Sequence, residues 1–423
     1  IVFGLAPALQ VSKPNLNEAL KEGSRQTSGS SHWLRSGLVV FEVAISLVLL
    51  VGAGLLARSF LSLLRTNPGF NPDHVLTMNI MLPGAKYKTE PQRAAFYNDL
   101  VQRVKAQPGV ESAALVNFIP LGGSNSSDSY LVEGAPEPAP GQENEGRYRV
   151  CTPDYFRTMG IPIVQGRGFT EQDKAGAPPV VIVNETLARK HWPGESAVGK
   201  RIRFYGPVEK APWMEIVGVV EDVKHELDLA VTPEYYLPHA QDSWSGMVLV
   251  ARTTVDPGSL AGALRQQVWT IDKDQPVFDV KTMQEVRSAS VALYSFSSLM
   301  LAIFAGVALL LASIGIYGVM AFAVTQRTQE IGIRMALGAR AADVLKLVVK
   351  HGMKLALLGT VLGLLGSWAV TRFIDKLLVG VQPTDLLTFS VVSVFLLAAA
   401  FIACYLPARR ATKVDPLKAL RYE

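Results

Sequence analysis

The chain has 423 residues, of which 49% are apolar and 18% are charged, and its mean hydropathy is +0.24. This composition is too apolar for an ordinary soluble protein and too polar for one made only of membrane helices. The net charge of +5 does not indicate nucleic-acid binding, because the basic residues lie beside apolar segments and no nucleic-acid-binding motif accompanies them. We therefore expect membrane spans joined to a sizeable water-exposed domain.

The beginning of the chain is similar to its end. Residues 7–21 (PALQVSKPNLNEALK) align without gaps with residues 407–421 (PARRATKVDPLKALR), and both stretches follow an apolar run. Two interpretations are open, a chance match of short segments or an internal repeat. Under the second, residues 1–11 end the last membrane helix of a preceding copy, and the polar residues 12–36 form a cytoplasmic linker.

Four apolar segments have about the 20 residues that a helix needs to cross a bilayer core of roughly 30 Å. They are Leu38–Leu56, Phe304–Val324, Leu355–Ile374 and Leu386–Leu406. We predict a first span with its stalk at residues 37–65, a stalk and second span at 285–325, and further spans at 351–374 and 386–406.

Glu42 is the polar residue of interest within the first of these segments. A carboxylate at membrane depth is costly, so it is a candidate functional residue. The alternative is that Glu42, which lies near the start of the span, reaches a headgroup or a polar group of another helix.

Residues 66–284 have the composition of a water-exposed domain with its own core. An alternating strand at Val75–Leu82, a helix at Gln92–Ala106 with Thr89 as N-cap, and a strand at Val110–Phe118 predict a β-α-β unit. A second unit is predicted from Met247–Arg252, Pro257–Ile271 and Pro276–Val280. Between the two units we expect a turn-rich stretch at Gly122–Gly146, strands at Val180–Val183, Arg201–Tyr205 and Glu215–Val220, and a short helix at Asn184–His191.

The fold class predicted from these elements is an α-helical membrane bundle of four spans with a large α+β domain inserted between the first and second. That domain consists of two β-α-β units around a strand-rich lobe. The loop between spans two and three carries five basic residues, whereas the next loop carries only Arg372 and Lys376. Because basic loops stay in the cytoplasm, both termini are expected there and the inserted domain on the other side.

No catalytic, cofactor or metal site is predicted. Residues 194–201 (GESAVGKR) approach a phosphate-binding loop, but Arg201 replaces its hydroxyl residue, and a helix is expected before the motif where a strand is required. The histidines lack metal-ligand spacing. His225 lies among acids at Val219–Asp228, which we interpret as a solvated loop, and Cys151 and Cys404 are expected to be buried and unpaired.

The basic segment at residues 326–350 is the candidate interaction site. Within it, EIGIRMALGA (residues 330–339) places Glu330 and Arg334 four residues apart, a spacing that stabilises a helix, with Gly338 positioned to end it. A short cytoplasmic helix with an apolar stripe suits docking into a partner's groove. The alternative is an interfacial helix that only lies on lipid.

These residues carry a family resemblance. EIGIRMALGA, the order of one span, a large domain and three spans, and the cytoplasmic tail at residues 407–423 (PARRATKVDPLKALRYE) together resemble the MacB/FtsX-type permeases of type VII ABC transporters. YFRTMGIPIVQGRGF (residues 155–169) and HWPGESAVGKRI (residues 191–202) resemble the MacB-type periplasmic core domain. The repeated ending further resembles the duplicated orphan permeases of acidobacteria, of which this chain would be a C-terminal fragment.

The resemblance implies a non-catalytic permease subunit, without a nucleotide site, in a bacterial inner membrane. A separate cytoplasmic ABC ATPase would dock on a coupling helix through Arg327, Glu330, Ile331, Arg334 and Leu337, and its ATP hydrolysis would move the periplasmic domain to export peptides, drugs or lipid-linked cargo. Other implied partners are membrane lipid, a second permease copy, and a periplasmic adaptor or cargo. The alternatives are an FtsX-like regulator of a periplasmic enzyme, a receptor with an extracytoplasmic sensing domain, and a membrane-anchored hydrolase.

Overall fold

The computed structural model describes residues 29–136, 138–139, 141–205, 211–326, 333, 340–373 and 378–412. These residues form two compact units. One, which we call the inserted domain, comprises Leu63–Leu293, and the other, the helical unit, comprises the described residues before and after it.

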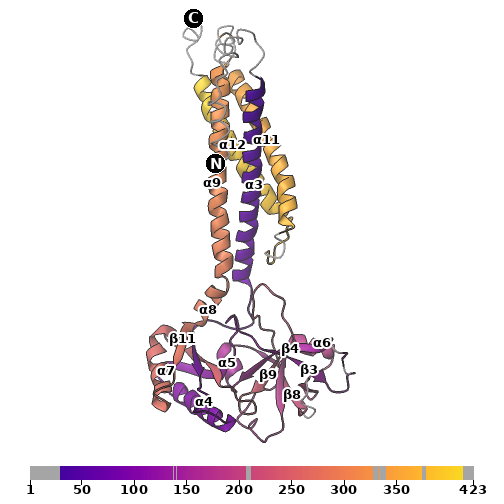
Figure 1. The fold of residues 1–423 in the computed structure, drawn as a ribbon, viewed down its shortest axis with the longest axis vertical. Coiled ribbons are helices and arrows are strands. Elements are labelled where there is room, and N and C mark those ends of the chain that lie inside the picture. Colours follow the sequence, from indigo (N-terminus) through magenta and orange to yellow (C-terminus); the bar gives the residue numbers. More distant parts are fainter. Residues whose placement is uncertain are drawn as a thin grey trace. The chain divides into compact units, whose positions relative to one another are not determined.

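The helical unit contains four long helices, α3 (Gly29–Arg65), α9 (Ala292–Gln326), α11 (Ala341–Thr371) and α12 (Leu386–Ala411) (Figure 1). Each is long and apolar enough to cross a membrane, as the sequence predicts. Large apolar side chains on their outer faces are more than half exposed, among them Phe304, Leu358 and Val394. Such exposure is typical of helices whose outer surface faces lipid rather than water.

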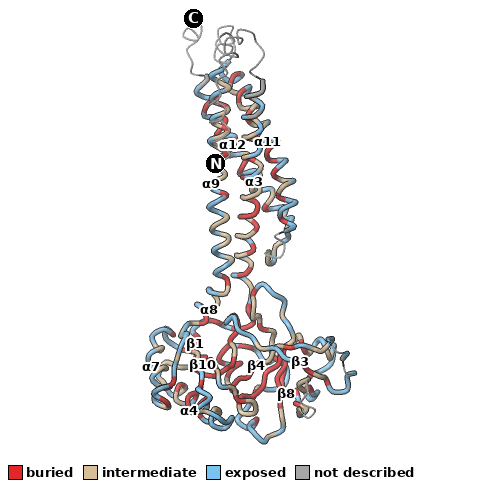
Figure 2. Tube along the Cα trace, viewed as in Figure 1, coloured by how far each residue is buried: buried red, intermediate tan, exposed pale blue. Residues whose placement is uncertain are grey.

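α3 is the helix around which the other three pack. Its buried residues recur every fourth position, and each is at most 3% exposed: Val39, Val43, Leu47, Val51 and Leu55 (Figure 2). Four residues turn a helix through about 400°, so this buried stripe advances by about 40° at each step and winds around α3. The winding lets α3 meet different neighbours along its length.

Glycines allow the closest of these helix contacts. A side chain at Gly359 of α11 would meet Val43 of α3, and one at Gly363 would meet Leu47 and the backbone oxygen of Ala44. The two glycines are four residues apart, which is the small-xxx-small spacing of tightly packed membrane helices. α11 and α3 therefore touch almost backbone to backbone.

The inserted domain has two lobes. One, which we call the α/β lobe, is formed by the beginning and the end of the domain's sequence and contains both predicted β-α-β units. They are β1 (Val75–Met81), α4 (Glu90–Lys105) and β2 (Val110–Val116), then β10 (Gly246–Thr253), α7 (Pro257–Ile271) and β11 (Val277–Thr282), which α8 (Met283–Ser290) follows. The strand order β11-β1-β10-β2 is antiparallel between neighbours, so each unit is split by a strand of the other. The Gln92 side chain accepts a hydrogen bond from the Thr89 N–H at the start of α4, where the sequence places the cap.

The other half, the barrel lobe, is a closed ring of strands. In spatial order the ring runs β4 (Asn144–Cys151), β3 (Ser127–Val132), β7 (Arg201–Phe204), β8 (Met214–Val220), β6 (Val180–Asn184) and β9 (Glu234–Pro238), and β9 pairs back onto β4. Closure removes the exposed edges of an open sheet. β5 (Ile163–Gly166) adds to β8, and the short helices α5 (Tyr155–Met159) and α6 (Glu185–His191) complete the lobe.

The turn-rich stretch predicted at Gly122–Gly146 does contain turns and bends, but the prediction missed β3 and the start of β4, which also lie there. Their outward positions carry Ser, Asp, Asn and Glu, which are the residue types that also mark turns. The inward positions are aromatic: Tyr235 of β9 contacts Tyr130, Tyr148 and Phe204 with ring centroids 5.8–6.0 Å apart. These four rings pack against one another within the apolar core of the barrel.

Candidate functional site

Glu42 lies at the contact between α3 and α9. Its Oε2 occupies the space in which a side chain of Gly315 would begin, so the close approach of the helices depends on this glycine. Among the residues that the structure describes, no Lys or Arg forms an ion pair with Glu42. The polar residue predicted within the first span is thus half-buried against a neighbouring helix. Its functional role stays a prediction.

A second polar contact, which the sequence did not predict, joins α3 to the start of α12. Arg58 forms an ion pair with Asp385, and Asp385 also accepts a hydrogen bond from the Thr388 N–H at 2.8 Å and so caps α12. The hydroxyl of Ser59 accepts a hydrogen bond from the Val379 N–H at 2.8 Å. These contacts fix the segment before α12 to the C-terminal part of α3.

Basic residues gather at the other end of the helical unit. The guanidinium of Arg35 lies 4.5 Å from the Phe322 ring centroid, and Arg410 donates a hydrogen bond to the Tyr317 hydroxyl at 2.7 Å. The predicted coupling residues follow α9 in the sequence and lie outside the described residues: Arg327, Glu330, Ile331, Arg334 and Leu337.

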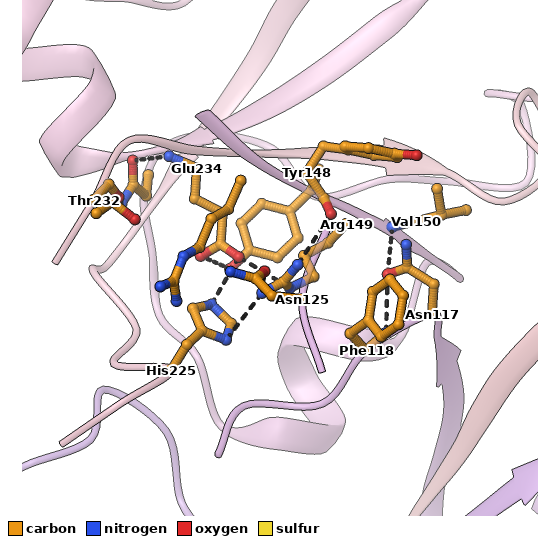
Figure 3. Close-up of polar contacts among 12 residues, drawn as sticks. Asn117, Phe118, Asn125, Tyr148, Arg149, Val150, His225, Thr232 and Glu234 are labelled. Atoms are coloured by element: carbon orange, nitrogen blue, oxygen red, sulfur yellow. Dashed lines mark hydrogen bonds and ion pairs between the residues drawn. The ribbon is translucent and has the colours of Figure 1, made fainter. Parts of the chain in front are cut away.

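The inserted domain holds a buried charge cluster made by Arg149, Glu234 and His225 (Figure 3). Arg149 Nε lies 3.2 Å from Glu234 Oε1, and His225 Nε2 lies 2.7 Å from the same oxygen. Arg149 also donates to Asn125 Oδ1 at 2.7 Å and contacts His225 Nδ1 at 3.1 Å. Because arginine can only donate, Nδ1 of His225 accepts and Nε2 carries the proton that faces Glu234.

The cluster is organised to keep Glu234 ionised. Burial by itself raises the pKa of this carboxyl, but the contacts with His225 and Arg149 and the hydrogen bond from the Tyr236 hydroxyl outweigh it, so the pKa lies below the usual 4.5. The interpretation of His225 as part of a solvated loop is therefore wrong. The loop after β8 folds over β4 and β9, and the side chain of His225 is 8% exposed.

This cluster offers no nucleophile. Cys151, on β4, is buried, and burial followed by the nearby charge of Glu234 raises the pKa of its thiol well above 9.0. Cys404 is also buried and free, so both cysteines are as predicted. Within the described ranges no group of three or more His, Cys, Asp or Glu could hold a metal ion.

The phosphate-loop-like segment has the wrong surroundings for nucleotide binding. Helix α6 precedes residues 194–201, and β7 begins at Arg201. A phosphate-binding loop needs a preceding strand and a following helix. The predicted order of a helix before the segment and a strand after it is confirmed.

Two family models match this chain. The MacB-like periplasmic core domain matches residues 36–267, more than half of the chain, and the FtsX-like permease C-terminal region matches residues 302–416. The chain belongs to the MacB/FtsX-type ABC transporter permeases. Its architecture is that of the family, a membrane part of four helices that carries a MacB-type periplasmic core domain.

Relatives in this family differ in how much of their length the chain matches. The uncharacterized ABC transporter permease YknZ of Bacillus subtilis is 24% identical over 407 residues, 93% of this chain and 96% of YknZ. The macrolide export ATP-binding/permease protein MacB of Acinetobacter baylyi is 24% identical over 295 residues, 67% of this chain and 44% of MacB. MacB of Hahella chejuensis is 25% identical over 423 residues, which cover 93% of this chain and 59% of that MacB. The chain thus spans about half the length of the MacB relatives.

Proposed function

We propose that this chain is the permease subunit of an ABC-type complex in which a separate cytoplasmic ATPase drives movement of the periplasmic domain. Membership of the MacB/FtsX-type family supports this role, as does the similarity to YknZ along nearly the whole chain. The permease contributes no nucleotide site and no catalytic step of its own. Its work is to transmit force across the membrane.

The observation that carries the proposal is that the inserted domain begins and ends within membrane helices. Leu63 lies in the last turn of α3 and Leu293 in the first turn of α9. Arg287 of α8 donates a hydrogen bond at 2.6 Å to the carbonyl of Leu64, one of the unpaired carbonyls at the end of α3. Only Val291 separates α8 from α9. The segment by which the chain enters the inserted domain and the segment by which it leaves are therefore hydrogen-bonded to each other.

The sidedness follows from charge. Arg35 and Arg410 contact the C-terminal part of α9, and the basic loop follows α9 in the sequence. Basic loops remain in the cytoplasm. In this orientation both termini and the coupling segment face the cytoplasm, and the inserted domain faces the periplasm. Arg327, Glu330, Ile331, Arg334 and Leu337 would contact the ATPase, and Glu42 would act within the moving contact between α3 and α9.

The cargo belongs to the classes expected from the sequence, namely peptides, drugs or lipid-linked molecules. MacB relatives are named for macrolide export. A second permease copy, membrane lipid and a periplasmic adaptor complete the proposed assembly.

The coupling role is tested by reversing charges in the full-length chain and measuring co-isolation of an ATPase from membranes of the native bacterium. Glu330→Arg and Arg334→Glu should each abolish co-isolation while insertion is retained. The double variant Glu330→Arg/Arg334→Glu distinguishes two causes of lost co-isolation. If the pair only stabilises the helix, the double variant restores co-isolation. If the two residues contact the partner, co-isolation stays lost.

The matched control is the Asp99 and Arg103 pair on α4, which has the same four-residue spacing at 2.9 Å. Reversing Arg103 to Glu should leave co-isolation unchanged. Co-isolation that survives both Glu330→Arg and Arg334→Glu would contradict the proposed docking site.

A further inference from the structure

The two lobes of the inserted domain meet along β2 and β4 and at α5, which packs against β2 and β10. β2 of the α/β lobe pairs with β4 of the barrel lobe at Val116 and Cys151. The chain leaves the α/β lobe after Val116 and returns to it after the barrel strand β9, through residues 239–245. A cleft of about 480 Å³ lies at this junction, and residues of both crossings, including Asn117, Phe118 and Trp244, line it.

The walls of this junction cleft combine apolar and polar side chains. Phe118, Trp244 and Phe278 provide aromatic surface, and Met81 and Phe278 are each 49% exposed although both are large and apolar. The two charged residues in the lining, Asp279 and Lys281, form an ion pair with each other. Because the charges cancel, the cleft favours an uncharged molecule over an anion or a cation.

Asn117 supplies the polar group that lacks a partner. Its Oδ1 accepts hydrogen bonds from the N–H groups of Phe118 at 2.9 Å and Val150 at 3.1 Å, which fixes the orientation of the amide. Asn117 is 4% exposed, and its Nδ2 has no hydrogen-bond partner among the described residues. A buried amide donor without a partner is uncommon, and this one belongs to a residue that lines the cleft.

We propose that the junction cleft binds an uncharged small molecule of mixed polarity. The apolar body of this molecule packs against the edge-to-face pair of Phe118 and Trp244, whose ring centroids lie 5.6 Å apart. A small shift of the side chains that cover Nδ2 of Asn117 lets an acceptor of the molecule, such as an amide or ester carbonyl, reach this donor. The cleft volume lies within the range of roughly 300–1,000 Å³ that is typical of small-molecule sites, which also favour the boundaries between domains. Adaptable methionine side chains suit a range of ligand shapes.

Binding at this place would involve several elements of the inserted domain. The ligand touches both crossings between the lobes, and it also touches Val286 and Ala289 of α8, the helix that leads into α9. A molecule held there would therefore contact both crossings and α8 at once. The inference does not depend on an ATPase, because the site consists of residues of this chain alone.

The test uses the full-length chain in lipid nanodiscs, without nucleotide, and titrates N-acetyl-leucyl-4-fluorophenylalaninamide while its ¹⁹F NMR signal is followed. This probe is uncharged and carries several carbonyl acceptors. Empty nanodiscs measure its partition into lipid, which does not saturate. We expect saturable binding to the native chain and at least a tenfold loss of affinity in Trp244→Leu.

Two further variants sharpen the result. Asn117→Asp preserves Oδ1 and the shape of the side chain while it removes the donor, and it should weaken binding by a similar factor. Trp213→Leu is the matched control, because Trp213 packs against Arg203 with 4.9 Å between the guanidinium and the ring centroid and does not line the cleft. The native affinity in Trp244→Leu, or no saturable binding to the native chain, would overturn the proposal. Both outcomes are independent of ATPase co-isolation.

Discussion

Gly359 of α11 lies directly against Val43 of α3: a Cβ on the glycine would lie 2.7 Å from the Cβ of the valine. It would also lie 2.8 Å from the backbone oxygen of Val40, which cannot rotate away as a flexible side chain can. The two helices must therefore separate if a side chain is added at this position.

Gly359→Ala should accordingly destabilise the helical unit by about 1–3 kcal/mol, the usual penalty for overpacking a close contact. Unfolding of the full-length chain in detergent micelles measures it. Gly306→Ala on α9 is the control, because a Cβ there has nothing within 4 Å. This control should be neutral or slightly stabilising, since Ala favours a helix over Gly. Equal losses in the two variants would contradict the packing described for α3 and α11.

Glu42→Leu is expected to stabilise the helical unit by about 1–3 kcal/mol, because a carboxylate in a membrane helix is costly and no described cation pairs with it. The same unfolding assay measures the change. If Glu42 lowers the stability of the helical unit, we expect it to have a function there. Glu42→Leu should then also lose ATP-driven movement of the periplasmic domain. A destabilised Glu42→Leu would indicate that the carboxylate has a stabilising partner.

Glu234→Gln should destabilise the inserted domain by about 3–5 kcal/mol, because it leaves Arg149 buried without its counter-charge. Glu133→Gln is the comparison, since its partner Arg201 is 48% exposed and solvent screens the pair, so little change is expected. Thermal unfolding of the full-length chain reports both. Similar melting temperatures for the two variants would refute the importance of the buried cluster.

The low pKa of Glu234 also leads us to expect that the stability of the inserted domain falls in acid. Its folded pKa is below the ordinary 4.5, so its contribution to stability is present above pH 4.5 and is lost as the pH falls towards the folded pKa. The difference in stability between the native chain and Glu234→Gln should shrink steadily below pH 4.5. A difference that stays constant down to pH 3 would exclude this carboxyl as a source of acid lability.

His239 predicts a second pH effect at a higher range. Burial lowers its pKa from 6.5 to about 4, so the unfolded chain takes up a proton between these values and the folded chain does not. Stability should fall by about 3 kcal/mol as the pH drops from 6.5 to 4. His239→Phe should flatten this slope, since both ring nitrogens lack partners among the described residues. A slope that stays the same in His239→Phe would contradict this assignment.

The parts of the fold predicted from the sequence are those set by local patterns. Each span follows from one apolar run, and α7 occupies Pro257–Ile271 as predicted, because Asp256 caps it at Ser259 and Pro257 occupies its first turn. The contact between Gly359 and Val43 was missed, although the four-residue spacing of Gly359 and Gly363 is a visible signal.

The buried cluster could not be predicted in the same way. Arg149 and Glu234 meet only because β4 and β9 pair in parallel, with Arg147 beside Glu234 and Arg149 beside Tyr236. No local pattern specifies that register, and His225 in a run of acids has the composition of a solvated loop. The junction cleft likewise depends on two crossings that are distant in the sequence.

The central claim, that a cytoplasmic coupling segment drives a domain on the opposite side of the membrane, is tested most directly by site-directed labelling. Gln172→Cys in the exposed part of the inserted domain and Thr328→Cys in the coupling segment would be introduced separately, with the buried native cysteines as the unreactive background. A membrane-impermeant maleimide should label position 172 only in right-side-out vesicles and position 328 only in inside-out vesicles. Labelling of both positions from the same side would contradict the account.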